Sequence, residues 1–129
     1  MTAKKAYATA FVFIIAADKK VGKWEPVKLK AALKGIVDDD EISEFIKQCI
    51  EYANKNSLET FVQESAQVLN GKQRLCLLLN LLDSISSNGK IAVDDEVVFR
   101  IISKAYRFGK KELKDYEEMI SIKNDKSTF

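Results

Sequence analysis

The sequence predicts an all-α protein: a bundle of about seven helices, with two pseudo-symmetric helix–loop–helix repeats around two central apolar helices. Three observations support this prediction. Apolar residues recur at helical spacing along nearly all of the 129 residues. A single proline and five glycines leave few positions that would interrupt long helices. Two stretches, residues 6–17 and 75–82, are apolar on most sides, as central helices of a bundle are.

Composition indicates one globular domain. Hydrophobic residues make up 47% of the chain and charged residues 31%, which is not the composition of a disordered protein. We expect a single domain over residues 1–122, followed by a polar, disordered tail over 123–129. The 21 basic and 19 acidic residues give a net charge of only +2, so we expect no nucleic-acid partner.

The first predicted helix spans Thr2 to Ala17 and imitates a signal peptide, because a basic start precedes an apolar run. The run, Ala6 to Ala17, is shorter than the roughly 20 residues that a membrane span needs. No clean cleavage site precedes Asp18. We therefore expect a buried helix in a cytoplasmic protein with no membrane span.

Two helices follow in the first half of the chain. One begins around Trp24, carries Pro26 in its first turn and ends at Gly35. The next follows the acidic run 38–41, which we expect to cap it, and has an apolar stripe from Ile42 to Ala53.

The remaining helices are expected over residues 56–69, 72–85, 93–108 and 111–120. Asn56 or Ser57 opens the first of these, Asn56 would form a capping box with Glu59, and Asn70-Gly71 ends the helix. Gly109 is expected to close the helix that starts at Val93.

Cys49 and Cys76 each lie among apolar residues in a helical pattern. One disulfide is conceivable for two cysteines, but we favour two buried, reduced core residues. Their spacing does not match a zinc site, and histidine is absent from the sequence.

An internal duplication relates the two predicted repeats. The segment Ala16–Glu25 aligns with Ser86–Asp95, and the apolar helix before each segment aligns as well. The matched pairs are Asp18 with Asn88, Lys20 with Lys90, Val21 with Ile91, and Glu25 with Asp95. Such a repeat predicts a bundle with a pseudo-twofold axis.

This pattern resembles the tellurite-resistance TerB-like family, and the predicted fold is similar to the N-terminal domain of DnaJ-like membrane-anchored co-chaperones. The family motif, an apolar helix followed by Asp-Gly-x-hydrophobic-x-x-x-Glu, occurs twice. The copies here begin at Asp18 and Asn88; Lys19 replaces the glycine of the first, and Asn88 the aspartate of the second. The resemblance covers roughly Tyr7 to Tyr116 and implies a stress-response domain with no established catalysis.

The resemblance also implies a divalent-metal site in the loops. Candidate oxygen ligands for Ca²⁺, Mg²⁺ or Mn²⁺ are Asp18, Glu25, Asn88, Asp95 and Glu96. In the alternative that we favour, Asp18 and Asn88 form turns after helices. Glu25, Asp95 and Glu96 then stabilise helix N-termini. No EF-hand loop is present in the sequence.

The sequence offers little support for an enzyme, since it has no histidine, nucleophile elbow or Gly-rich phosphate loop. Besides a metal-binding protein and an enzyme, a third possible function is a protein-interaction module, whose partner would be a second copy of the chain or another protein. Trp24 would serve an interface if exposed, although packing over its loop is the simpler interpretation. Segment 110–124 is amphipathic and would either close the bundle or meet a partner. We predict a non-enzymatic stress-response binding or scaffold protein, with metal binding and dimerisation as alternatives.

Overall fold

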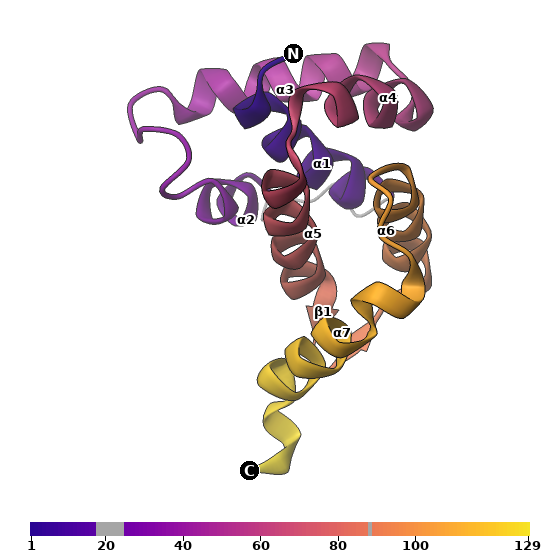
Figure 1. Cartoon of the computed structure of the whole chain (residues 1–129). Helices are drawn as coiled ribbons and strands as arrows, with labels where there is room; N and C mark the ends of the chain where they lie inside the picture. Colours follow the sequence, from indigo (N-terminus) through magenta and orange to yellow (C-terminus); the bar gives the residue numbers. More distant parts are fainter. Residues whose placement is uncertain (18–24, 88) are drawn as a thin grey trace.

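The computed structural model of the chain describes residues 1–17, 25–87 and 89–129, and these residues form an all-α protein (Figure 1). The helices are α1 (Ala3–Ala17), α2 (Glu25–Ala32), α3 (Ile42–Lys55), α4 (Leu58–Val68), α5 (Gly71–Ile85), α6 (Val93–Ala105) and α7 (Lys110–Asn124). Two short strands, β1 (Ser86–Ser87) and β2 (Lys90–Ile91), and a final 3₁₀ turn, Lys126–Thr128, complete the described elements. The predicted fold class, a bundle of about seven helices, is confirmed.

Helix α1 lies at the centre of the bundle and contacts α2, α3, α4, α5 and α6 (Figure 1). Its small residues Ala6, Ala8 and Ala10 are fully buried, which lets neighbouring helices approach closely. The second apolar helix, α5, buries Leu77, Leu78, Leu81 and Leu82 and contacts α1, α6 and α7. The predicted repeats correspond to α1–α2 and α5–α6, and the two helices of each repeat contact one another.

The loop of the second repeat contains a β-ribbon that was not predicted. Ser86 pairs with Ile91 and Ser87 with Lys90, antiparallel. Gly89 closes the ribbon with a φ of +79°, a left-handed conformation that glycine adopts readily. The ribbon lies against α7, where the Ser121 hydroxyl donates a hydrogen bond of 3.1 Å to the Gly89 carbonyl.

Helix α7 closes the lower end of the bundle and continues past its predicted end at Ile120 to Asn124 (Figure 1). Leu113 is fully buried, whereas Met119 is exposed. At the C-terminal end, the Lys123 ammonium and the Asn124 amide each donate a hydrogen bond of 2.9 Å to Oδ1 of Asp83 on α5. Segment 110–124 therefore packs against the bundle along one side only.

The predicted capping box of Asn56 with Glu59 is wrong. Ser57 is the N-cap of α4, and its hydroxyl oxygen accepts a 3.1 Å hydrogen bond from the Thr60 backbone N–H. Asn56 instead ends α3, where its side-chain amide donates to the Tyr52 carbonyl. The alternative start at Ser57 is therefore confirmed, and because the third residue after this N-cap is Thr60, Glu59 is out of register for a capping box.

Asn70-Gly71, predicted to end the fourth helix, begins the fifth. The Asn70 side chain accepts a 2.8 Å hydrogen bond from the Gln73 N–H, and the Gln73 side chain accepts a 2.9 Å bond from the Asn70 N–H. This reciprocal pair is a capping box, and it satisfies two backbone donors that a helix start leaves open.

The prediction that Gly109 closes the sixth helix is also wrong. Arg107 takes the left-handed conformation, with φ of 67°, and the Phe108 N–H then reaches the Ser103 carbonyl at 2.9 Å. Gly109 has a φ of −77° and begins α7, where its N–H donates to the Glu112 carboxylate. The end of α6 is therefore set by backbone hydrogen bonds around Arg107, two residues before the glycine.

Side chains of the acidic run 38–41 were expected to cap α3. The N-cap of α3 is Glu41, which has a helical backbone conformation and makes no side-chain capping hydrogen bond. Asp38, Asp39 and Asp40 precede it and are exposed. That expectation is wrong for the N-cap residue itself.

Both cysteines are free thiols, but only Cys49 is buried. The prediction of a buried position is wrong for Cys76, which is exposed. The reason is the phase of α5: its buried leucines share one side, and position 76 falls on the opposite side of the helix. Across the described ranges, no helix combines the length and the apolar character that crossing a bilayer would require.

Candidate functional site

Three of the predicted site residues, Asp18, Trp24 and Asn88, lie outside the described residues. Glu25 is the first residue of α2, and its side chain is likewise outside what the structure describes. The metal and interaction hypotheses for these four positions therefore stay predictions.

Asp95 and Glu96 lie in the first turn of α6, next to Asp94. The N-cap of this helix, Ala92, offers no side-chain acceptor, and the negative charges of the acids lie near the positive N-terminal end of the helix dipole. Asp95 is 7% exposed, and the Glu96 carboxylate lies 3.6 Å from the Arg100 guanidinium. This placement is the one that the capping interpretation requires.

Within residues 1–17, 25–87 and 89–129, no three His, Cys, Asp or Glu side chains are grouped closely enough to hold a metal ion. Asp95 and Glu96 thus belong to no such group among the described side chains. A metal site built on them would need ligands from the first loop or from Asn88.

The most distinctive surface feature is a row of aliphatic side chains on the outer side of α6. Val93, Val97 and Ile101 are 76%, 54% and 36% exposed, and their four-residue spacing aligns them along the helix. We call these three residues the α6 stripe. The opposite side of the same helix supplies Val98, Phe99, Ile102 and Tyr106 to the core. Helix α6 is therefore apolar on two sides, and only one of them is covered.

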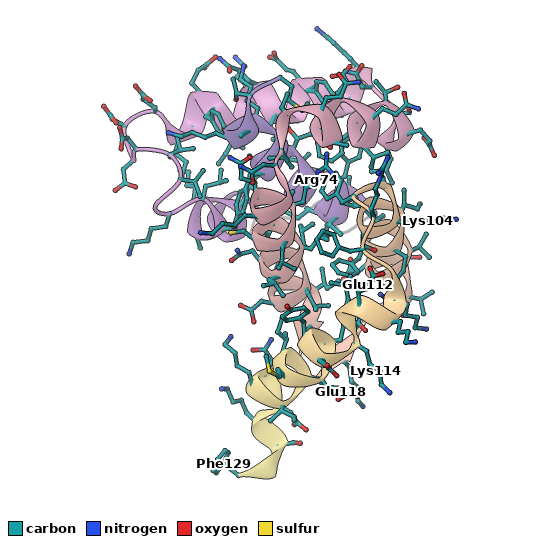
Figure 2. The ribbon with its side chains drawn as sticks, viewed as in Figure 1. Arg74, Lys104, Glu112, Lys114, Glu118 and Phe129 are labelled. Atoms are coloured by element: carbon teal, nitrogen blue, oxygen red, sulfur yellow. The ribbon has the colours of Figure 1, made fainter. Side chains whose placement is uncertain are left out.

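A groove of about 560 Å³ runs between α6 and α7, beside the stripe. We call it the α6–α7 groove; its lining residues are Ile91, Glu96, Arg100, Lys114, Glu117, Glu118, Ser121 and Ile122. Figure 2 shows Lys114 and Glu118 on α7. Ile122, at the end of the groove, is 77% exposed. The groove thus adds exposed aliphatic surface and charges of both signs next to the stripe.

Arg100 joins the two helices that form the groove. Its guanidinium forms an ion pair with Glu117 of α7 and lies over the Phe99 ring, 5.5 Å from the ring centroid. The second acidic partner is Glu96, one helical turn earlier on α6. Because these contacts hold Arg100 at the edge of the stripe, a positive and a negative charge stand one turn apart along it.

A smaller pocket of about 260 Å³ lies between α1, α3 and α4 and contains Thr9 and Cys49, both almost completely buried. Burial raises the pKa of the Cys49 thiol, although the nearby Thr9 hydroxyl and the charge of Lys5 act in the opposite direction. The raised pKa keeps this thiol protonated at neutral pH, and a protonated thiol is a poor nucleophile.

The α6 stripe was missed by the sequence reasoning, although its four-residue spacing is visible in the sequence. Comparisons of the chain with protein-family models, with curated proteins and with solved structures give no match. The TerB-like resemblance accordingly rests on the duplicated motif alone.

Proposed function

We propose that this chain is a non-enzymatic, TerB-like interaction module whose working surface is the α6 stripe together with the α6–α7 groove. The observation that carries the proposal is the exposure of Val93, Val97 and Ile101 in one row on a helix whose other side is buried.

The three residues of the α6 stripe form a group on the surface. Single exposed aliphatic residues, such as Ile50 on α3, are ordinary on protein surfaces. An apolar row beside a groove that ends in Ile122 is a larger patch, and such patches mark interaction sites. Covering apolar surface contributes about 25 cal/mol per Å². A partner that covers the stripe therefore gains binding free energy without any change in the bundle.

The biological setting is also part of the proposal. We place the module in a cytoplasmic stress response, as the TerB-like resemblance implies. Two free cysteines support a reducing compartment. The raised pKa of the Cys49 thiol supports a role without nucleophilic catalysis by this residue.

Site-specific photo-crosslinking in cells tests the proposal. A benzophenone amino acid at position 97 should give a discrete covalent adduct on irradiation, because a bound partner would lie within reach of the stripe. The matched control carries the same amino acid at position 50, where Ile50 is 41% exposed but stands apart from the stripe. Adducts at both positions, or at neither, would contradict the proposed surface.

A further inference from the structure

We propose that the partner on the α6 stripe is a second copy of this chain, packed so that the two α6 helices run antiparallel about a twofold axis. This inference rests on the proposed function, since it names the occupant of the same surface. Two features of the stripe support it, its spacing and the charges beside it, and a third, its extent, sets the expected strength of the dimer.

The spacing of the stripe suits self-packing. Residues four apart form a ridge on a helix, and two such ridges interlock when the helices cross at about −50°. Both helices use the same kind of ridge in that arrangement, so two copies of Val93, Val97 and Ile101 can pack symmetrically. The interface closes on itself and produces a dimer, not a filament.

The charges beside the stripe select the antiparallel orientation. Glu96 and Arg100 lie one turn apart on the same flank of α6, on the side of the groove. A twofold axis at the level of residue 98 brings Glu96 of each copy toward Arg100 of the other. In a parallel twofold pair the two flanks would lie on opposite sides of the interface, so these charges would not meet across it. Val97 then lies next to the axis and meets its own symmetry mate.

The extent of the stripe predicts a weak dimer. A stable interface buries about 800 Å² on each partner. Three aliphatic side chains on each copy, with the groove rim around Ile122, supply only part of that area. We therefore expect reversible association with a dissociation constant on the order of 10–100 μM.

Two measurements on the full chain test the inference. Sedimentation equilibrium over a wide concentration range should show a monomer–dimer equilibrium for the wild type. Glu96→Arg should weaken the dimer about tenfold, because it places two arginines at each of the two symmetric contacts. The matched control is Glu44→Arg, a charge reversal at an exposed position in the first turn of α3, which should leave association unchanged.

Cysteine cross-linking then reports the orientation. The background carries Cys76→Ser, because Cys76 is the exposed native thiol. Val97→Cys should form a covalent dimer with itself under a short bismaleimide reagent. Val93→Cys mixed with Ile101→Cys should cross-link to each other faster than either does to itself, whereas a parallel dimer gives the reverse. Circular dichroism confirms that each variant is folded before it is used.

The results separate the inference from the proposed function. A wild type that stays monomeric up to 1 mM, about tenfold above the weakest expected dissociation constant, would overturn the inference. If photo-crosslinking at position 97 still gives an adduct of another mass, the interaction surface stands and the partner is a different protein. If neither experiment gives a product, both proposals fail.

Discussion

The left-handed glycine of the β-ribbon supports a quantitative prediction. Gly89 has a φ of +79°, and a Cβ added there would lie 3.0 Å from Ser121 Oγ and 3.2 Å from the Ser121 carbonyl oxygen. The first of these atoms belongs to a small side chain, but the second is backbone of α7 and moves only with the helix. Gly89→Ala should therefore combine backbone strain of about 1–2 kcal/mol with an overpacking cost of about 1–3 kcal/mol.

Gly35 provides the matched control. Its φ is +86°, and an added Cβ would meet no heavy atom within 4 Å. Gly35→Ala should thus cost the backbone strain alone, about 1–2 kcal/mol. The difference between the two variants measures how closely α7 approaches the ribbon, because the strained conformation is common to both.

Urea unfolding followed by circular dichroism at 222 nm gives the free energy of unfolding of each variant. We expect Gly89→Ala to cost at least 1 kcal/mol more than Gly35→Ala, within the overpacking range. Hydrogen exchange should also become faster in the last two turns of α7, because the helix must retreat from the ribbon. Equal costs for the two variants, with unchanged exchange in α7, would refute the close approach of Ser121 to Gly89.

Three further predictions concern buried and charged contacts. Tyr106→Phe and Ser65→Ala each break the buried 2.7 Å hydrogen bond between these side chains and should each cost about 1–3 kcal/mol of unfolding free energy. The double variant should cost less than the sum, and additive costs would contradict coupling. Hydrogen bonds from Lys123 and then Asn124 hold the pKa of the Asp83 carboxyl below its usual value. The stabilisation by this contact should be complete when the pH is above the ordinary pKa of an aspartate and be lost as the pH falls through the lowered pKa of Asp83. It should be absent in Asp83→Asn. Because the ion pair is exposed, its contribution to the free energy of unfolding should stay below about 1 kcal/mol. Chelator-stripped protein should unfold at the same temperature with or without Ca²⁺, Mg²⁺ or Mn²⁺, as the capping interpretation requires. A metal-dependent gain of about 2.7 kcal/mol at a hundredfold excess over the dissociation constant, lost in Asp95→Asn, would establish the metal site instead.

Helical periodicity was sufficient to predict the fold class. It was not sufficient to predict which residues adopt a left-handed backbone conformation. The pattern marks where α5 and α6 lie, because their apolar residues recur every three to four positions. It does not say which residue turns left-handed after α6, since that depends on where the Phe108 N–H finds its acceptor. Gly109 was the natural choice by residue type, yet Arg107 adopts this conformation.

The candidate surface was harder to predict for a related reason. Val97 and Ile101 are four residues apart, and so are Val98 and Ile102, which each follow them by one position. Periodicity shows that α6 has two apolar sides but not which of them faces α1 and α5. The same ambiguity affects Cys76, because the stretch around it is apolar at nearly every position. Only the tertiary arrangement determines which side is covered.

The central position of α1 has a consequence during synthesis of the chain. This apolar helix is synthesised before the helices that cover it, and one of these, α6, begins only at Val93. At about 5–20 residues per second, translation takes roughly 4–18 s between the end of α1 and the completion of α6. During that interval α1 lacks the contacts that α6 will make, and nascent chains with exposed apolar surface aggregate or bind chaperones. Codon choice and chaperone supply should therefore affect the yield of this protein more strongly than its final stability would suggest.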